Sequence, residues 1–250
     1  MEIQWIFTDA DVARVRAFMH EHGENRLVSY RVQRNIERRP TAIAPEDFWY
    51  CLVACLLTTQ QRSGPDSAVM KFLRIDPFPL GLDACRGCDD VAGLATKALA
   101  NAGGIRRGPT IAEEIRKNLE WMEDKWWPEL EDKLRPLLTA DDALAEREIA
   151  RWIDSQFYGF GPKQSRNLLQ MLGLTRYEIP LDSRVAKRLN EFGFPLQISA
   201  GALGDEHMYE FMMDGVQALC RRCDIYPCVF DAAMFASFDG DGWRDLPMVW

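Results

Sequence analysis

An amine and a carboxylate occupy positions where they could act together in catalysis. Lys163 follows a Gly-Phe-Gly run at 159–161, and Asp182 precedes a basic stretch. Between them lie one helix's worth of amphipathic sequence and a connector that returns the backbone. We therefore expect Lys163 and Asp182 to face one site. A lysine amine there can form a Schiff base, and a carboxylate can stabilise positive charge.

The sequence around Lys163 predicts two helices joined by a tight hairpin. Gly159 and Gly161 allow backbone angles closed to other residues, so the turn and the following helix N-terminus can offer N–H groups to a phosphate oxygen. Ser165 is small where the two helices would cross. Contacts of this kind position a duplex without reading its bases.

The hairpin and the segment around Asp182 together resemble a known family. The run Gly-Phe-Gly-Pro-Lys at 159–163 and the run Leu-Asp-Ser-Arg-Val at 181–185 are similar to the motifs of the helix-hairpin-helix DNA glycosylase superfamily. The resemblance is specific over residues 151–190, looser over 45–120 and absent from the first forty residues. It implies an all-α, two-lobed fold with an interlobe cleft that accepts an extruded nucleotide.

The resemblance also implies a reaction. Asp182 would stabilise the positive charge that develops on the sugar as the glycosidic bond breaks. Lys163 would displace the base and form a Schiff base, which permits β-elimination of the 3′ phosphate. We expect a DNA N-glycosylase with AP lyase activity on double-stranded DNA, requiring neither cofactor nor metal, with an oxidised base such as 8-oxoguanine as the first expectation.

Other activities are compatible with the same residues. The substrate could be an alkylated or hypermodified base, including those that protect phage DNA, which would make the protein a defence enzyme. A module that binds distorted DNA without chemistry is a further alternative. Lys163 would then be a phosphate contact, and Asp182 only the N-cap of the helix that follows it. Capping and catalysis are compatible.

Two glutamines and several basic residues are candidates for DNA contact. Residues 47–73 predict an apolar helix, a polar break at 58–64 and a second helix. Relatives have a similar turn, from which a glutamine enters the gap left by the flipped base. Arg184 stands where many members have histidine. The full set of expected DNA-binding residues is Gly159, Gly161, Ser165, Arg166, Arg184, Lys187, Gln60 and Gln61.

Three consecutive aromatic residues precede the turn at 58–64 that holds Gln60 and Gln61, which we call the glutamine turn. Phe48, Trp49 and Tyr50 either stack on the base in its pocket or belong to the core. The arginines at 26, 31, 34, 38 and 39 either add to the DNA-facing surface or form a solvated helix face. Further along, Ile111, Ile115, Leu119 and Met122 recur at helical spacing and predict an amphipathic helix.

Composition limits the class of protein. The chain has 250 residues, of which 47% are hydrophobic, enough for a substantial core in a single unit. We expect a helical lobe at about 41–138, a hairpin and catalytic lobe at about 139–195, and flanking helices at 1–40 and 196–250, with an irregular tail from 239. No long apolar span or signal sequence is found, so we expect a soluble, cytoplasmic monomer that contacts no membrane.

The overall charge excludes a protein that coats DNA indiscriminately. The net charge is −8, whereas phosphate neutralisation depends on clustered lysine and arginine. Locally the balance is reversed. Residues 151–190 hold seven basic residues against three acidic ones, which favours a focused DNA-facing patch.

The cysteines favour reduced thiols over a disulfide framework. Cys220, Cys223 and Cys228 are spaced similarly to an iron–sulfur loop in some relatives, but Met213 stands where the first ligand would fall. We therefore expect no cluster. A zinc site completed by Cys85 and Cys88 would need two distant segments to meet.

Overall fold

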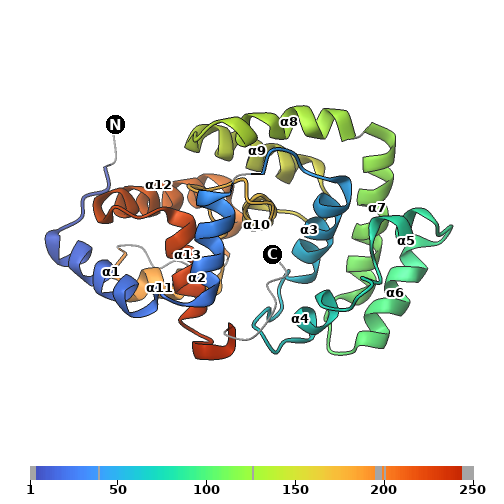
Figure 1. The fold of residues 1–250 in the computed structure, drawn as a ribbon, viewed down its shortest axis with the longest axis horizontal. Helices are drawn as coiled ribbons and strands as arrows, with labels where there is room; N and C mark the ends of the chain where they lie inside the picture. Colours follow the sequence, from blue (N-terminus) through green and yellow to red (C-terminus); the bar gives the residue numbers. More distant parts are fainter. Residues whose placement is uncertain (1–3, 39, 126, 195–198, 200, 244–250) are drawn as a thin grey trace.

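The computed structural model describes residues 4–38, 40–125, 127–194, 199 and 201–243. This part of the chain is helical and contains no strand, which confirms the predicted all-α class (Figure 1). The longer helices are α1 (Asp9–His22), α3 (Pro45–Leu57), α6 (Val91–Ala102), α7 (Gly108–Lys125), α8 (Trp127–Thr139), α9 (Ala143–Gln156), α10 (Pro162–Met171), α11 (Ser183–Glu191), α12 (Glu206–Cys223) and α13 (Pro227–Ala236). The shorter ones are α2 (Arg26–Arg31), η1 (Val32–Glu37), α4 (Ala68–Leu73), α5 (Leu82–Arg86), η2 (Ala202–Gly204) and η3 (Gly240–Trp243).

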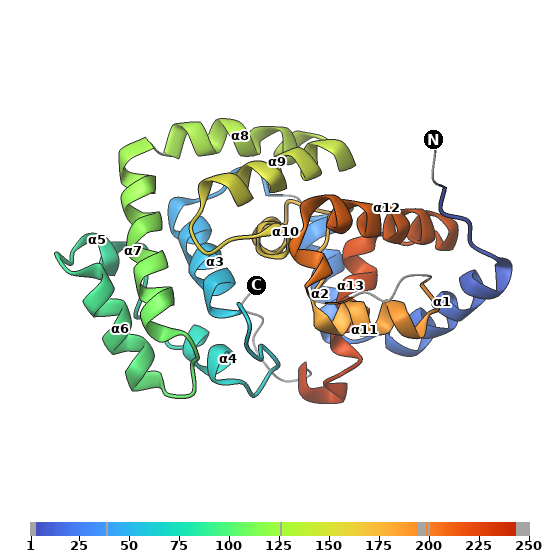
Figure 2. The ribbon, with the colours of Figure 1, turned by 180° about the vertical axis from the view of Figure 1, so that it is seen from behind.

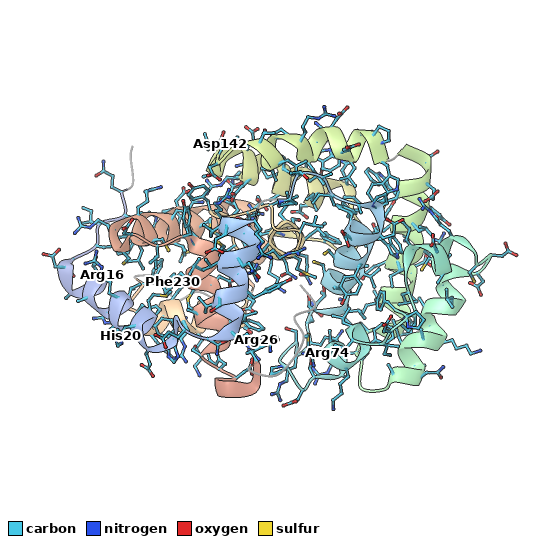
Figure 3. The ribbon with its side chains drawn as sticks, viewed as in Figure 1. Arg16, His20, Arg26, Arg74, Asp142 and Phe230 are labelled. Carbon is cyan, nitrogen blue, oxygen red and sulfur yellow. The ribbon has the colours of Figure 1, made fainter. Side chains whose placement is uncertain are left out.

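The molecule has two lobes, each built on its own hydrophobic core. One core lies among α2 to α10 and the Ala232, Ala233 and Ala236 face of α13, and the other lies among α1, α11, α12 and the opposite face of α13 (Figures 1 and 2). Figure 3 shows Phe230 inside the second lobe, with Arg16 and His20 on α1 at its outer side. The change from the first core to the second falls between Leu174 and Ile179. The hairpin thus packs in the first lobe and α11 in the second, which divides the lobe expected at 139–195.

Local sequence explains the helices that carry the site. In α3 every residue from Phe48 to Leu57 except Tyr50 is buried, and Pro45 occupies the first turn, where its missing N–H costs nothing. Ile111 and Ile115 lie on the apolar face of α7 and are fully buried, as the sequence predicts. The predicted break at 58–64 separates α3 from α4. These elements place the glutamine turn and the hairpin against each other.

The connector from α10 to α11 is held by buried carboxylates. The Glu146 side chain accepts hydrogen bonds from the backbone N–H groups of Arg176, Tyr177 and Glu178, each at 2.8 Å. The Glu178 carboxylate pairs with the fully buried guanidinium of Arg166 at 3.0 Å. Because this connector leads directly into Asp182, these bonds determine where that carboxylate lies relative to α10.

Part of the expected tail is ordered and packed. The indole of Trp243, in η3, is 1% exposed and belongs to the first core. Its Nε1 donates to Asp239, which also pairs with Arg184 at 2.6 Å. The expectation of an irregular tail is therefore wrong for residues 239–243, because a buried indole and an ion pair hold them. Residues 244–250 lie outside the described part.

No helix in the described ranges is long and apolar enough to cross a membrane.

Replacing Arg166 with alanine should strongly destabilise the protein. The substitution leaves Glu178 and Glu206 short of the guanidinium that both contact. Breaking a buried ion pair typically costs about 3–5 kcal/mol, so urea denaturation should show a lower free energy of unfolding by that amount. Arg222→Ala, which removes an exposed pair with Asp9, is the matched control and should leave stability almost unchanged. Equal effects of the two substitutions would contradict this account of the connector.

Candidate functional site

The predicted hairpin is formed by α9, the turn at 157–161 and α10. Gly159 has φ +80°, and a Cβ there would lie 2.6 Å from Glu114 Cδ and 2.7 Å from Leu56 Cδ2. Any side chain at 159 would therefore clash as well as strain the backbone. Gly161 is different, since its φ of −160° is ordinary extended backbone with open space around it. The expectation that both glycines are required by conformation is correct only for Gly159.

Helix α7 fixes the hairpin turn in place. The amide of Asn118 is fully buried, accepts from the N–H of Tyr158 at 2.8 Å and donates to its carbonyl at 2.9 Å. Sequence reasoning missed this residue. The available signal was a lone asparagine within the apolar face that Ile111, Ile115, Leu119 and Met122 define.

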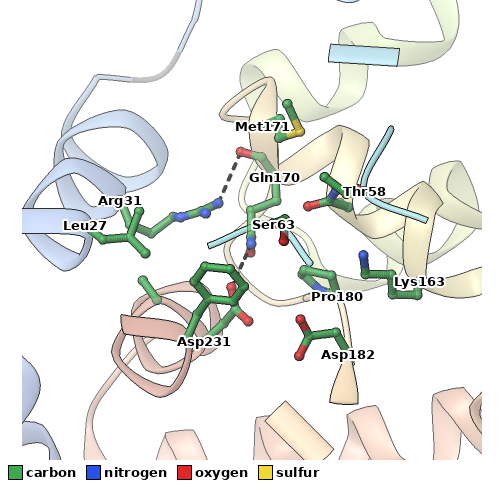
Figure 4. A pocket seen from close by; sticks show the side chains of 13 residues that line it. Leu27, Arg31, Thr58, Ser63, Lys163, Gln170, Met171, Pro180, Asp182 and Asp231 are labelled. Carbon is green, nitrogen blue, oxygen red and sulfur yellow. Dashed lines mark hydrogen bonds between the residues drawn. The ribbon is translucent and has the colours of Figure 1, made fainter. Parts of the chain in front are cut away.

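Lys163 and Asp182 lie together, as their spacing predicts. Figure 4 shows both on one wall of a small recess, and both also line the larger cleft outside it. Lys163 is half-buried in the first turn of α10, with its Nζ 3.3 Å from Gln164 Oε1. Asp182 caps α11, because its Oδ1 accepts from the N–H groups of Arg184 at 2.8 Å and Val185 at 2.9 Å. Capping occupies one oxygen and leaves Oδ2 for the site.

The cleft has a volume of about 710 Å³ and lies between the two lobes. The turn after α3, the hairpin, the start of α11 and η2 contribute its walls. Among the described residues, its lining has one carboxylate, Asp182, and four basic side chains: Arg62, Arg106, Lys163 and Arg184. The cleft is therefore locally basic although the protein is acidic overall.

The two glutamines have different environments. Gln60 is exposed in the cleft with φ +56°, a conformation rare outside glycine. Gln61 is tied down, since its amide donates to Leu57 O and its Oε1 accepts from the N–H of Arg106 at 2.8 Å. Gln60 is thus the glutamine whose side chain is available to a ligand.

Several expected DNA contacts are not accessible. Ser165 is fully buried and donates to Gly161 O at 2.9 Å, and Arg166 is fully buried between Glu178 and Glu206. Both expectations are wrong, because the face of α10 that carries Ser165 and Arg166 packs inside the protein. Lys187 is exposed on α11 outside the cleft lining, while Gly159, Gly161 and Arg184 line the cleft.

The three aromatics belong to the core and not to a base pocket. Phe48 and Trp49 are fully buried, and the Trp49 indole donates to Leu80 O at 2.8 Å. Tyr50 packs on Phe78 and donates to Leu73 O at 3.0 Å. None of the three lines the recess or the cleft. The stacking alternative is therefore wrong, because α3 turns this face toward α5 and α8.

Besides Thr58, three buried polar residues line the recess and were not among the candidates for it. They are Arg31 from α2, Gln170 from α10 and Asp231 from α13. Burial raises the pKa of Asp231 to about 7, opposed by the Arg31 guanidinium and reinforced by the negative charge of Asp182. The signal for Asp231 was a lone acid in the otherwise apolar helix PCVFDAAMFA. Arg31 had been weighed only as part of an arginine run, of which Arg39 lies outside the described residues.

No group of three or more histidine, cysteine, aspartate or glutamate side chains in the described ranges is placed to hold a metal ion. Cys220, Cys223 and Cys228 are buried free thiols. Burial raises the pKa of each.

No protein-family model and no curated protein matches the sequence. Three solved structures match the fold. The 8-oxoguanine DNA glycosylase of Thermotoga maritima is 17% identical with a TM-score of 0.65, over 93% of this chain and 97% of that one.

The other two are structures from Methanocaldococcus jannaschii. Its 8-oxoguanine glycosylase/lyase, in complex with a 15mer DNA containing 8-oxoguanine, is 12% identical with a TM-score of 0.65, over 91% of this chain and 98% of that one. Its 8-oxoguanine DNA glycosylase is 13% identical with a TM-score of 0.62, over 93% and 95%. The chain has the fold of the 8-oxoguanine DNA glycosylases. Within this glycosylase fold, Lys163 and Asp182 lie in the interlobe cleft beside the hairpin.

Replacing Asp231 with asparagine should change how stability depends on pH. The pKa of this carboxyl is raised from 3.8 to about 7 in the folded protein, so the folded state holds its proton more tightly than the unfolded state does. The wild type therefore loses the stability that this tightly bound proton contributes as pH rises from about 4 to about 7.

Asparagine does not ionise. Relative to the wild type, the free energy of unfolding of Asp231→Asn should rise over that window by up to about 4 kcal/mol and then level off. Urea denaturation between pH 4 and 8 measures the difference. A difference that stays constant with pH would show that Asp231 ionises normally in the folded protein.

Proposed function

We propose that this protein is a DNA glycosylase that flips a modified base out of double-stranded DNA and excises it, with AP lyase activity supplied by Lys163. The observation that carries the proposal is the meeting of Lys163 and Asp182 in a basic cleft beside the hairpin. The fold supports it, since the solved structures that share this fold are 8-oxoguanine DNA glycosylases.

Each part of the cleft has a task in this reaction. The hairpin turn at Gly159 and the first turn of α10 present backbone N–H groups that can bind a phosphate. Arg62, Arg106 and Arg184 add positive charge along the same cleft. Extruding a nucleotide leaves a gap in the stack, and the exposed side chain of Gln60 is suited to fill it.

The chemistry then needs only the chain's own groups. The Lys163 amine forms a bond to C1′ as the glycosidic bond breaks, and the base leaves with the bonding electrons and takes up a proton. The Asp182 carboxylate stabilises the positive charge on the sugar while this happens. Loss of a proton from the lysine nitrogen and opening of the C1′–O4′ bond give a Schiff base. Removal of a C2′ proton then expels the 3′ phosphate.

An oxidised base is the substrate class that we propose first. One of the structures with this fold is a glycosylase/lyase in complex with DNA containing 8-oxoguanine. The proposal extends that substrate to this chain on the strength of the fold and the lysine.

Borohydride reduction should trap the wild-type protein on duplex DNA containing 8-oxoguanine. Reduction converts the Schiff base into a stable cross-link, which is visible as a slower band in a denaturing gel. Lys163→Ala should abolish the cross-link, whereas Lys97→Ala, on the exposed face of α6, should leave it unchanged.

The same assay on duplexes with oxidised pyrimidines, alkylated bases or hypermodified bases tests the alternatives. A cross-link that appears only on one of these would replace 8-oxoguanine as the substrate. Base loss revealed by alkali without a cross-link would show a glycosylase that lacks lyase activity. Binding to distorted DNA with neither product would favour the non-catalytic module.

Replacing Asp182 separates capping from catalysis. Asparagine caps a helix about as well as aspartate does, so Asp182→Asn should keep its thermal midpoint while base excision slows about 100- to 1,000-fold. Asp182→Ala should lose both properties. Single-turnover excision and thermal melts give the two readouts. Full turnover in Asp182→Asn would leave the residue with a capping role alone.

A further inference from the structure

The Lys163 amine is held by the side chain of the next residue in α10. Gln164 Oε1 accepts from Lys163 Nζ at 3.3 Å and from the amide nitrogen of Asn167 at 3.5 Å. Lysine carries its amine on a long, flexible stem, so the nitrogen keeps one position only where another group fixes it. Gln164 is 5% exposed and can act as such a group, because a buried side chain has little freedom of its own.

The other end of the Gln164 amide is anchored to the C-terminal end of α3. Its Nε2 donates to the backbone carbonyl of Cys55 at 2.6 Å and to the hydroxyl oxygen of Thr59. The Thr59 hydroxyl in turn donates to the Cys55 carbonyl at 3.2 Å. Figure 4 shows Thr58, the C-cap of α3, on the same side of the recess as Lys163. A chain of hydrogen bonds therefore runs from the glutamine turn to the amine.

These partners fix which way the Gln164 amide points. The Cys55 carbonyl can only accept, so it requires the NH2 end of the amide, and the oxygen is left for the lysine. The opposite orientation would set oxygen against oxygen at Cys55 and donor against donor at Lys163. The amide oxygen is thus directed at the amine by α3.

Helix α3 does not depend on this amide for its own hydrogen bonds. The Cys55 carbonyl also accepts from the N–H of Thr58 at 3.2 Å and from the Thr58 hydroxyl at 3.0 Å. Removal of the Gln164 amide would leave this carbonyl with its other donors. The contact of Gln164 with Lys163 is therefore open to a test that leaves the fold in place.

We infer that Gln164 is a positioning residue, which holds the Lys163 amine for attack on C1′ and ties it to the glutamine turn. A neutral amine can donate one N–H to Oε1 and keep its lone pair for the sugar carbon. An amine that is held in advance loses less freedom when its bond to C1′ forms, and this lowers the barrier. The inference rests on the proposed function and adds how its nucleophile is oriented.

A neutral acceptor suits the charges around the amine. The Cys55 thiol of α3 is close enough to interact electrostatically with Lys163. A carboxylate at 164 would touch the nitrogen directly and favour the ammonium form, which has no lone pair. Glutamine orients the amine without adding that charge. The charged groups that share the recess or the cleft with Lys163 are Asp182, Asp231, Arg31, Arg62, Arg106 and Arg184.

The link to the glutamine turn connects two steps of the reaction. Thr59 is adjacent to Gln60, whose exposed side chain is suited to fill the gap left by the extruded nucleotide. Because Thr59 also holds the Gln164 amide, a correctly placed turn also holds the amine in place.

The test measures Schiff base formation by the full-length protein on a duplex with a preformed abasic site, which requires no particular base. Timed borohydride trapping under single-turnover conditions gives the rate, and titration of the duplex gives the dissociation constant. Gln164→Met keeps the length of the side chain and removes both ends of the amide. It should slow cross-linking by about tenfold while the protein remains folded and binds the duplex as tightly as the wild type. Gln33→Met, half-buried in η1 outside the recess and the cleft, is the matched control and should change neither quantity.

A second substitution tests the link to the turn. Thr59→Val removes one anchor of the amide and should slow cross-linking by about threefold. Added to Gln164→Met it should cause no further loss, because Thr59 acts on the amine through Gln164.

A third substitution tests the effect of charge. Gln164→Glu keeps an acceptor beside the amine and adds a carboxylate, which favours the ammonium form. Its cross-linking rate should therefore fall below that of the wild type at about pH 7 and approach the wild-type rate at about pH 9. Gln164→Met should stay slow over the same range, since it lacks the acceptor at every pH.

Three results would overturn the inference while the proposed function stands. They are cross-linking by Gln164→Met at the wild-type rate, additive effects of Thr59→Val and Gln164→Met, and a Gln164→Glu rate that equals the wild-type rate at every pH. The last of these decides the matter even where Gln164→Met does not fold. A wild type that forms no cross-link at an abasic site, or a cross-link that Lys163→Ala retains, would instead reject the proposed lyase function itself.

Discussion

The position of the site depends on how one carboxylate, Glu146, holds the backbone after α10. It accepts three consecutive N–H groups, at residues 176 to 178, and so satisfies donors that no helix or sheet could pair. Glu178 then pairs with Arg166, and Tyr209 accepts from the N–H of Leu181 and donates to the carbonyl of Ile179. Asp182 follows directly. The distance between the amine of α10 and the carboxylate of α11 is thus set by buried polar bonds across the boundary of the two lobes.

Buried and paired side chains also determine where positive charge is left on the surface. Most arginines of the hairpin region are used inside the protein, as with Arg166, or in pairs with acids, as with Arg147 and Arg151. The basic side chains that line the cleft are Arg62, Arg106, Lys163 and Arg184, and Arg184 is paired with Asp239. An acidic protein with a locally basic cleft repels nucleic acid over most of its surface and attracts it at the site. That arrangement is consistent with the proposed binding of DNA at the cleft.

Local pattern explains the successes of the sequence analysis, and side-chain orientation explains its errors. The hairpin, the helix after Asp182 and the helix at 108–125 follow from glycine positions, capping and apolar spacing, all of which act over a few residues. The assignment of Ser165 and Arg166 to DNA contact failed because only the packing of neighbouring helices decides which face of α10 is buried. The alternative that placed Phe48 and Trp49 in a base pocket failed because α3 is buried on nearly all sides. For Gln60 and Gln61 the same turn exposes one side chain and binds the other to Arg106.

By itself the sequence determined the fold class, the hairpin and the pairing of Lys163 with Asp182, because the motif spacing and the helix signals that specify them lie within forty consecutive residues. Only the tertiary structure decided what surrounds that pair. Arg31, Gln170 and Asp231 come from three helices far apart in the chain and meet in one recess, and no periodicity or composition records such a meeting. The physical reason is that helices distant in the chain bury a charged side chain when they pack together. Burial of this kind depends on how the lobes pack and not on any local segment.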